Sequence, residues 1–397
     1  MNDLIEAGSP VALVTYSTRP RGGVAHTLAL AEALHALGQE VLVVGLGDPD
    51  AGFFREVAAP THIVRAPTVA GGLEEKVAAN IDALEVGLTE VARTFPILHT
   101  QDCISARAAA RVRDAGAPVR VVRTVHHVDD FESQVLVDCQ LQAILEPDQI
   151  LVVTKIWEEI LARDPGVTSQ IVPNGVDVAR YRNADPGLAS RLRARVGATG
   201  RPMILSVGGI EPRKGSDTLV AALAMLVKGR TPAPVLAVVG GHSFQDHRAY
   251  RERVLATLAP LGLELGKDIV EVGSVPEEEM AAWYDAADLL AFPSVKEGFG
   301  LAALEAMAAG TPVVTSDLPV FREWMVPGRD ALFAPVGDAC ALAAAMAEVL
   351  DDGVLRSRLV AAGRGLADRF SWEASARRHL AVYVQAPSVV RSQVSLS

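Results

Sequence analysis

Cysteine, aromatic residues and surplus positive charge are all scarce in this sequence. Its three cysteines, Cys103, Cys139 and Cys340, are far apart and form no C-x-x-C pair. This excludes a disulfide framework and a zinc ribbon, and it is typical of a reducing compartment. Aromatic residues are only 5% of the 397 residues, whereas half of the residues are hydrophobic. We therefore expect an aliphatic core built from helices and parallel strands.

The formal net charge is −11, and this acidity argues against a nucleic-acid partner, because proteins that neutralise many phosphates carry a basic face. A small anionic ligand remains compatible with it, since a few backbone amides and one or two cations bind a diphosphate locally. No apolar run reaches the roughly 18 residues of a membrane span, and no cationic leader precedes an apolar stretch. These features predict a cytoplasmic protein with at most peripheral membrane contact.

Short apolar strands alternate with helices along most of the chain. The first half opens with a strand at 11–16, a helix at 24–37 and a strand at 41–45. Because such strands are apolar throughout, they predict a parallel sheet covered by helices on both faces. The pattern restarts near residue 203, so the fold class is α/β, with two Rossmann-like parallel-sheet domains facing across a cleft. The other predicted strands are 96–99, 119–122, 150–153 and 170–172, then 203–207, 235–239, 269–272, 289–292 and 313–314.

A less regular stretch at 173–202 is predicted to link the two domains, together with a short helix. This gives a first domain at 1–180 and a second domain at 181–372. A last helix is predicted at about 373–390, with Trp372 at its start and Tyr383 near its middle. Two placements stay open for it: packed back on the first domain, or a plain C-terminal helix.

One strand–loop–helix segment carries two carboxylates. Residues 292–305 read Phe-Pro-Ser-Val-Lys-Glu-Gly-Phe-Gly-Leu-Ala-Ala-Leu-Glu, with seven residues between Glu297 and Glu305. Glycines let the backbone approach a ligand, the first helical N–H groups bind anions, and carboxylates accept hydrogen bonds from hydroxyls. The alternative is a solvated turn and a structural ion pair. Function is favoured because Glu305 lies in an otherwise uncharged helix, where an unpartnered charge is costly.

A second loop, Gly208-Gly209-Ile-Glu-Pro-Arg213-Lys214-Gly215, follows the first strand of the second half. An α/β sheet places its ligand loops at such strand ends. Arg213 and Lys214 offer positive charge to a diphosphate, although a lysine beside a glycine is equally common on plain surfaces.

Together these motifs resemble glycosyltransferase family 4. The resemblance extends to Val-Pro-Asn-Gly-Val-Asp at 172–177 and Gly-Thr-Pro-Val-Val at 310–314, and so covers nearly the whole chain. It implies a GT-B fold, a nucleotide-sugar donor held mainly by the second domain, retention of anomeric configuration, and no metal or other cofactor.

The resemblance also implies roles for single residues. Glu305 would bind the ribose hydroxyls, Glu297 the transferred sugar, and Lys214 the diphosphate, where its charge would aid departure of the leaving group. His126 would be the active-site histidine, with a sugar-orienting or electrostatic role. The implied catalytic residues are His126, Glu297 and Lys214, and the implied donor-binding residues are Gly22, Gly23, Arg213, Lys214, Glu297, Gly298, Phe299, Gly300, Leu301 and Glu305.

Several alternatives stay open. Many relatives carry Gly-Arg where this chain has Gly208-Gly209, so either Arg213 supplies the missing charge or the diphosphate is held by less of it. His126 could instead be a structural hydrogen bonder. His127, Asp129 and Asp130 could be metal ligands, and the role of His127 stays open.

Two further signals have ordinary explanations. Asp48-Pro49-Asp50 matches the Asp-x-Asp of metal-dependent sugar transferases, but a turn is favoured. Arg107, Arg111 and Arg113 form a basic helix face that could meet a lipid acceptor, but a solvated face is favoured.

The sequence thus predicts a retaining, metal-independent glycosyltransferase using a nucleotide-sugar donor and a small-molecule, glycan or lipid acceptor. A nucleotide-sugar epimerase and a non-catalytic nucleotide-sugar sensor are the alternatives. Acceptor, donor base and sugar, pathway and oligomeric state are not determined by the sequence.

Overall fold

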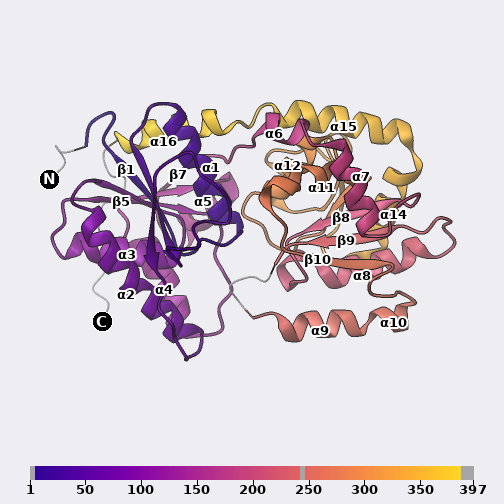
Figure 1. The fold of residues 1–397 in the computed structure, drawn as a ribbon, viewed down its shortest axis with the longest axis horizontal. Helices are drawn as coiled ribbons and strands as arrows, with labels where there is room; N and C mark the ends of the chain where they lie inside the picture. The colour runs from indigo at the N-terminus through magenta and orange to yellow at the C-terminus, as the bar shows by residue number, and fades with distance from the viewer. Residues whose placement is uncertain (1–4, 242–245, 386–397) are drawn as a thin grey trace. The chain divides into compact units, whose positions relative to one another are not determined.

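The computed structural model of the chain describes residues 5–241 and 246–385, and these residues form two compact domains. The first domain contains the described residues up to Gly175 together with those from Trp372 onward, and the second domain is Val176–Ser371. The chain therefore enters the second domain five residues before the predicted boundary at 180. Each domain is a parallel sheet with helices on its faces (Figure 1).

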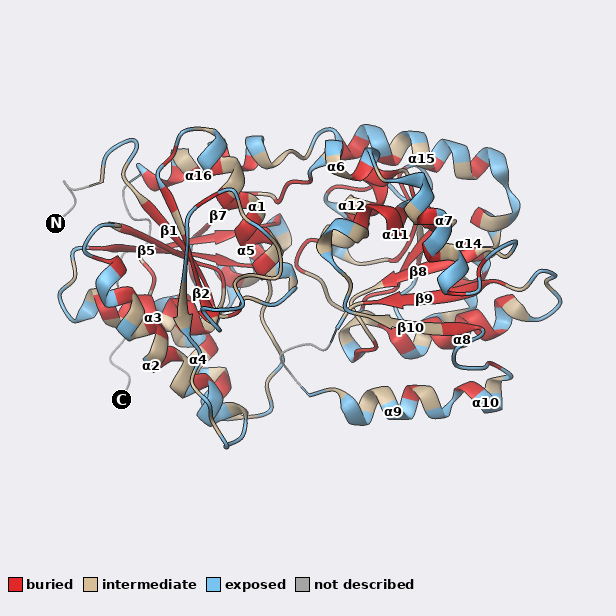
Figure 2. Cartoon of the chain, viewed as in Figure 1, coloured by how far each residue is buried: buried red, intermediate tan, exposed pale blue. Residues whose placement is uncertain are grey.

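The sheet of the first domain has seven strands in the order β3-β2-β1-β4-β5-β6-β7, and neighbouring strands are parallel. Its central strands are short and buried along their whole length, as Figure 2 shows for β1 and β5. Strand β1 is almost entirely apolar, whereas β5 carries the buried arginines Arg120 and Arg123. The edge strand β3 was not predicted, because its sequence Thr-His-Ile-Val-Arg is polar and largely exposed. The strands are β1 (Val11–Thr15), β2 (Val41–Gly47), β3 (Thr61–Arg65), β4 (Ile97–Thr100), β5 (Arg120–Val125), β6 (Gln149–Val152) and β7 (Ser169–Ile171).

Helices connect these strands and bury one face each. In α2, Val77, Ile81, Leu84, Leu88 and Val91 recur at helical spacing and are buried. The start of α3 is fixed by a capping box between Asp102 and Ser105. The helices are α1 (Gly22–Ala36), α2 (Leu73–Val91), α3 (Cys103–Asp114), α4 (Gln134–Leu145), α5 (Lys155–Arg163) and, from the end of the chain, α16 (Trp372–Tyr383).

Helix α16 packs on the first domain, beside α1. Its side chains Ala376, Val382 and Tyr383 lie in the same core as strand β1. The Tyr383 hydroxyl is 2.8 Å from Nδ1 of His99, and the Tyr383 carbonyl accepts a hydrogen bond from Arg120 at 2.7 Å. Of the two placements considered for the last helix, the structure has the one on the first domain. The predicted helix ran to 390, and its residues 386–390 lie outside the described part of the chain.

The sheet of the second domain has six strands in the order β10-β9-β8-β11-β12-β13, again parallel. Strand β13 was not predicted, because it has only three residues, Leu-Phe-Ala. The strands are β8 (Met203–Val207), β9 (Val235–Val239), β10 (Ile269–Gly273), β11 (Leu289–Phe292), β12 (Val313–Ser316) and β13 (Leu332–Ala334).

The helices of the second domain begin directly after the crossing at Val176. The stretch predicted as a linker with one short helix forms two helices, α6 and α7, which pack on α11 and α12. The helices are α6 (Val178–Arg182), α7 (Pro186–Arg195), α8 (Ser216–Val227), α9 (Arg248–Ala256), α10 (Leu258–Leu261), α11 (Met280–Ala286), α12 (Leu301–Ala309), α13 (Pro319–Arg322), α14 (Ala339–Asp351) and α15 (Gly353–Ala367), with single 3-10 turns at η1 (Pro212–Lys214) and η2 (Glu277–Glu279).

The strand orders fix where ligand loops lie. In the first sheet β1 is flanked by β2 and β4, and in the second β8 is flanked by β9 and β11. The chain therefore winds away from β1 and from β8 in both directions, and α/β proteins bind ligands at the carboxyl ends of such strands. Gly22 follows β1, His126 follows β5, Lys214 follows β8 and Glu297 follows β11. Within each domain, the predicted site residues thus lie at the carboxyl edge of the sheet.

We expect Tyr383→Phe to destabilise the first domain. The variant would leave Nδ1 of the fully buried His99 without its partner, which costs about 1–3 kcal/mol. Equilibrium urea unfolding measures this, with Tyr250→Phe as the control, because the half-buried Tyr250 hydroxyl bonds to the exposed residue Asp217 and to no buried ring. Equal effects of the two substitutions would contradict the importance of the His99 bond.

Candidate donor site and active-site histidine

Two loops of the second domain are in direct backbone contact. The amide of Val295, after β11, donates to the carbonyl of Arg213, after β8, at 2.8 Å. Gly215 has a φ of +63°, and a Cβ on it would lie 2.2 Å from the Pro293 carbonyl oxygen. Only glycine fits both the left-handed backbone and this close approach. The loops that carry Lys214 and Glu297 are therefore held together by the backbone itself.

A charged cluster joins the same two loops. Oε1 of Glu297 lies 2.6 Å from Nζ of Lys214 and 3.0 Å from Nη1 of Arg213, and it accepts a hydrogen bond from the Ser294 hydroxyl at 2.9 Å. The Lys214 ammonium also lies 4.6 Å from the centre of the Phe292 ring. The Glu297 and Lys214 side chains are only 8% and 12% exposed, whereas Arg213 is 33% exposed. Three of the predicted residues thus form one cluster, and Ser294 is a member that was not predicted.

The cluster stays charged. Burial by itself raises the pKa of Glu297, but Lys214 and Arg213 outweigh it and hold the pKa at about 2. Burial lowers the pKa of Lys214, and its pairing with Glu297 opposes this. Two cations and one carboxylate leave one net positive charge, which suits an anionic ligand.

The start of α12 is the next part of this edge. Gly300 caps the helix with a φ of +95° and has no side chain to bond the first helical amides. A Cβ on Gly300 would lie 2.6 Å from the Phe321 ring, so a larger residue does not fit. The Phe299 side chain is buried and stacks on Trp324 at 5.2 Å, which makes it a core residue. Any ligand contact of Phe299 would therefore come from its backbone.

Glu305 lies further along α12, in a separate cluster. Its Oε2 accepts a hydrogen bond from the Tyr284 hydroxyl at 2.7 Å, and Tyr181 also bonds to the carboxylate. Burial raises the pKa of Glu305, and the Tyr284 bond opposes this. Neither tyrosine was predicted, because both lie in helices whose sequences carry no ligand motif.

In the first domain, Gly22 and Gly23 begin helix α1 and His126 directly follows β5. A Cβ on Gly23 would lie 3.9 Å from the His126 ring, an ordinary contact, so the glycine is next to the histidine. A Cβ on Gly22 would meet no atom within 4 Å. Packing within the protein therefore does not require glycine at position 22.

His126 is bonded to a residue that was not predicted. Its Nε2 is 3.0 Å from Oε1 of Gln101, which is 4% exposed and follows β4. The ring of His26 meets the His126 ring edge-on at 4.6 Å, and Nδ1 of His26 is 2.9 Å from Oδ1 of Asn174. Asn174 belongs to the Pro-Asn-Gly motif at 173–175, so this motif supports the histidine.

Four histidines lie together in this part of the first domain: His26, His99 and His379 are buried, and His126 is partly exposed. Burial lowers the pKa of every one of them, to about 3 for His126 and to about 4 for His379. His126 is therefore neutral at pH 7, which is consistent with an orienting or dipolar role.

Two other signals from the sequence have structural explanations. Asp48-Pro49-Asp50 is a turn, with the Asp50 amide donating to Asp48, and Arg65 pairs with both carboxylates at 3.3 Å. Nε2 of His127 lies 3.3 Å from Asp129. Among the residues that the structure describes, no three His, Cys, Asp or Glu side chains are grouped as metal ligands.

The predicted basic face of α3 is neutralised. Arg107 pairs with Glu146, Arg111 lies 2.7 Å from Asp82, and Arg113 lies 3.0 Å from Asp148. Because each of the three arginines pairs with a carboxylate, they do not form the uncompensated positive face that would attract an anionic membrane. They are not freely solvated either. None of the helices in the described ranges has the length and hydropathy required to cross a membrane.

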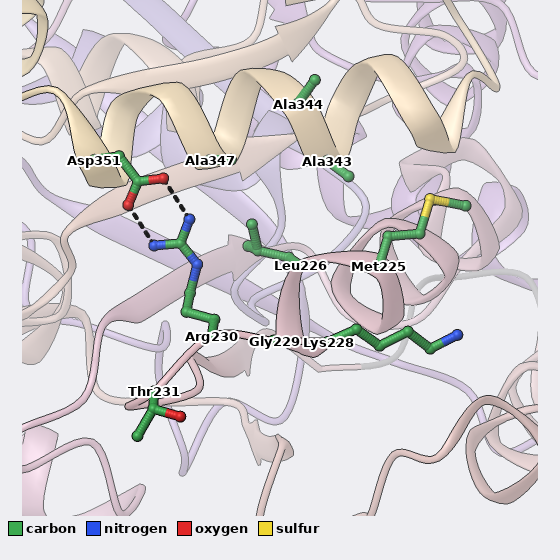
Figure 3. Close-up of a pocket in the computed structure, with 10 residues that line it drawn as sticks. All are labelled: Met225, Leu226, Lys228, Gly229, Arg230, Thr231, Ala343, Ala344, Ala347 and Asp351. Carbon is green, nitrogen blue, oxygen red and sulfur yellow. Dashed lines mark hydrogen bonds and ion pairs between the residues drawn. The ribbon is translucent and has the colours of Figure 1, made fainter.

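A surface groove of about 540 Å³ lies elsewhere on the second domain, between α8 and α14 (Figure 3). Met225 and Ala343 line it, and Arg230 closes one side through a two-bond pair with Asp351 at 2.6 Å. Lys228, which lines the groove, directly follows the last residue of α8, whereas Gly215 directly precedes the first. The 12 residues of α8 rise by about 1.5 Å each, so Lys228 and Gly215 are roughly 18 Å apart. The groove is therefore separate from the charged cluster.

Comparison with known proteins agrees with this geometry. The family described as "Glycosyl transferases group 1" matches residues 190–366, and "Glycosyltransferase Family 4" matches residues 20–180. A phosphatidyl-myo-inositol mannosyltransferase of Mycobacterium leprae is 31% identical over 93% of this chain and 94% of its own length. A D-inositol 3-phosphate glycosyltransferase of a Nocardioides strain is 30% identical over 76% of this chain and 69% of its own.

Solved structures show the same fold. A sucrose-phosphate synthase from Thermosynechococcus elongatus superposes with a TM-score of 0.78 at 25% identity, covering 94% of this chain and 98% of the other. Anabaena HepE, solved in complex with UDP and glucose, gives a TM-score of 0.77 at 18% identity over 94% and 99%. The two Rossmann-like parallel-sheet domains are those of a GT-B glycosyltransferase. The chain belongs to glycosyltransferase family 4.

The buried histidines make stability depend on pH. In the unfolded chain each histidine takes up a proton near pH 6.5, but in the folded chain none does until the pH is far lower. Their contribution is present above pH 6.5 and is lost as the pH falls, with a slope that approaches about 1.4 kcal/mol per pH unit for each histidine below pH 6.5. Urea unfolding between pH 7.5 and 5.5 should show this loss.

His379→Gln should reduce the slope by about a quarter, because it removes one of four similar groups. His62→Gln is the matched control, since His62 is exposed on the edge strand β3. A wild-type unfolding free energy that does not change over this pH range would contradict the assignment of four neutral histidines.

Proposed function

We propose that this glycosyltransferase moves a sugar from a nucleotide-diphosphate donor to its acceptor, with retention of configuration and without a metal ion, in the cytoplasm. The observation that carries the proposal is the cluster of Lys214, Arg213 and Glu297 at the carboxyl edge of the second sheet. It combines buried cations with a carboxylate, beside a glycine-capped helix. Those are the groups that a diphosphate joined to a sugar needs.

In this proposal Lys214 and Arg213 take the place that a metal ion has in other transferases. Negative charge grows on the diphosphate as the bond to the sugar breaks, and fixed cations stabilise that charge without having to reorganise. The amides of Gly300 and Leu301 would add the positive end of α12. Glu297, held ionised with a pKa of about 2, would accept hydrogen bonds from the sugar hydroxyls.

The first domain would supply the other contacts. The space that a side chain at position 22 would occupy is free of protein atoms, which supports a role for Gly22 in close ligand approach. Neutral His126, held by Gln101, would orient the transferred sugar. Because burial disfavours its charged form, we do not assign it the role of a general base.

The acceptor class to test first contains inositol. Relatives at 30–31% identity are named for D-inositol 3-phosphate and for phosphatidyl-myo-inositol. The pairing of Arg107, Arg111 and Arg113 with carboxylates gives no separate support for a lipid acceptor. We therefore place the water-soluble inositol phosphate before the lipid in the order of assays.

Donor binding is tested by thermal shift against UDP, GDP, ADP and their sugar conjugates, with and without EDTA. A ligand that binds only the folded chain stabilises it by about 2.7 kcal/mol at a hundredfold excess over Kd. We expect a selective shift that persists in EDTA. A shift that disappears with EDTA would overturn metal independence, and no shift with folded protein would overturn the donor site.

Lys214→Ala should lower kcat by about a hundredfold or more, because it removes a cation from the departing diphosphate. Lys228→Ala is the control on the same domain, at the distant end of α8. Turnover is followed by nucleotide release that depends on an inositol phosphate or another acceptor. Release of an altered nucleotide sugar with no acceptor consumed would indicate an epimerase, and donor binding without any turnover would indicate a sensor.

A further inference from the structure

The carboxylate of Glu305 is held by two tyrosines from separate helices. Tyr284, on α11, is fully buried and donates from its hydroxyl to Oε2 at 2.7 Å. Tyr181, on α6, is 5% exposed and bonds to the same carboxylate. Their rings meet edge-on with centres 5.7 Å apart. Glu305 itself keeps partial exposure, so the phenols are more deeply buried than the group that they hold.

The tyrosines are themselves fixed in place. The backbone carbonyl of Tyr284 accepts a hydrogen bond from the Thr311 hydroxyl at 2.7 Å. The guanidinium of Arg180 lies 5.6 Å from the Tyr181 ring centre and pairs with Glu277 at 3.0 Å. The Thr311 bond therefore fixes the backbone of Tyr284, and Arg180 packs against the Tyr181 ring.

The chemistry of the pair is one-directional. Burial raises the pKa of both phenols well above 10. At neutral pH each hydroxyl therefore stays protonated and acts as a hydrogen-bond donor to the carboxylate. An ionised carboxylate offers about four acceptor positions. Two bonds from phenols therefore fix its orientation and leave acceptor capacity for a vicinal diol.

We infer that Tyr181 and Tyr284 are positioning residues that orient Glu305 to accept both hydroxyls of the donor ribose. This inference rests on the proposed function, because it assigns Glu305 to the nucleotide. It extends the site to α6 and α11, which neither the two-glutamate motif nor the Lys214 loop includes. It also gives a role to the segment directly after the crossing at Val176, which the sequence placed in a linker.

The test compares ligands with and without the ribose hydroxyls. Binding of UDP and GDP, and of their 2′,3′-dideoxy forms, is measured by calorimetry for wild type, Tyr284→Phe and Tyr181→Phe. Each Phe variant keeps the ring and removes only the hydroxyl, and Tyr250→Phe is the matched control on the same domain. We expect about tenfold weaker binding of the preferred ribonucleotide in Tyr284→Phe, and no change for its dideoxy form.

A second readout is the pH dependence of ribonucleotide affinity. The groups that face Glu305 are Tyr284 on α11, Tyr181 and Arg180 on α6, and Glu277 on η2. The tyrosine bonds and Arg180 lower the pKa of Glu305, whereas burial and Glu277 raise it. Removing the Tyr284 hydroxyl should therefore make affinity fall at a higher pH than in wild type.

The outcomes are distinct. Equal loss for the ribose and dideoxy ligands would mean a merely structural role and would overturn the inference while leaving the donor site intact. Binding of no nucleoside diphosphate by folded wild-type protein would overturn the proposed function, and the inference with it. If Tyr284→Phe does not fold, the same comparison of ribose and dideoxy ligands with Tyr181→Phe tests the inference.

Discussion

The ion pair between Lys214 and Glu297 is the contact on which the second-domain site depends. It joins the loops after β8 and β11, whose backbones already meet at Gly215 and Pro293. Breaking a buried pair by removing one partner is costly, because the remaining charge is left uncompensated. The pair therefore links the two loops and also keeps a buried positive charge on Lys214 at the site. Because Lys214 is already largely removed from water, an anionic ligand can become its second partner at little further cost in desolvation.

The histidine site of the first domain obeys the opposite constraint. It gathers four histidines where burial disfavours their charged forms, and it satisfies them through neutral partners such as Gln101, Asn174 and Tyr383. The second domain has charged groups at its strand ends, whereas this cluster presents oriented dipoles. In the proposed reaction the charged cluster would stabilise the departing diphosphate, and the neutral cluster would orient the sugar by hydrogen bonds.

Much of this could be predicted from the sequence, for a physical reason. Central strands of parallel sheets are apolar on both faces, so 11–16 and 203–207 are visible as runs, and ligand loops follow them. The edge strands β3 and β13 were missed because one is polar and the other has three residues. The supporting residues were missed as well. They act through contacts between residues far apart in the sequence: Gln101 lies 25 positions from His126, and Tyr284 and Tyr181 lie 21 and 124 positions from Glu305. No local sequence spacing encodes such contacts.

The glycine pair after β8 shows why one substitution against the family pattern has to be interpreted with its neighbours. A Cβ on Gly208 would lie 2.6 Å from Cε of Lys214, and one on Gly209 would lie 2.8 Å from the Gly241 carbonyl oxygen, where φ is +78°. At Gly209 a side chain would meet backbone in a left-handed conformation, whereas at Gly208 the φ of +125° disfavours any side chain and Lys214 lies next to the space that it would take. Arg213 lies 3.0 Å from Oε1 of Glu297, the same oxygen that Lys214 contacts. We therefore infer that the second cation has moved along the loop, and that the site keeps two positive charges around one carboxylate.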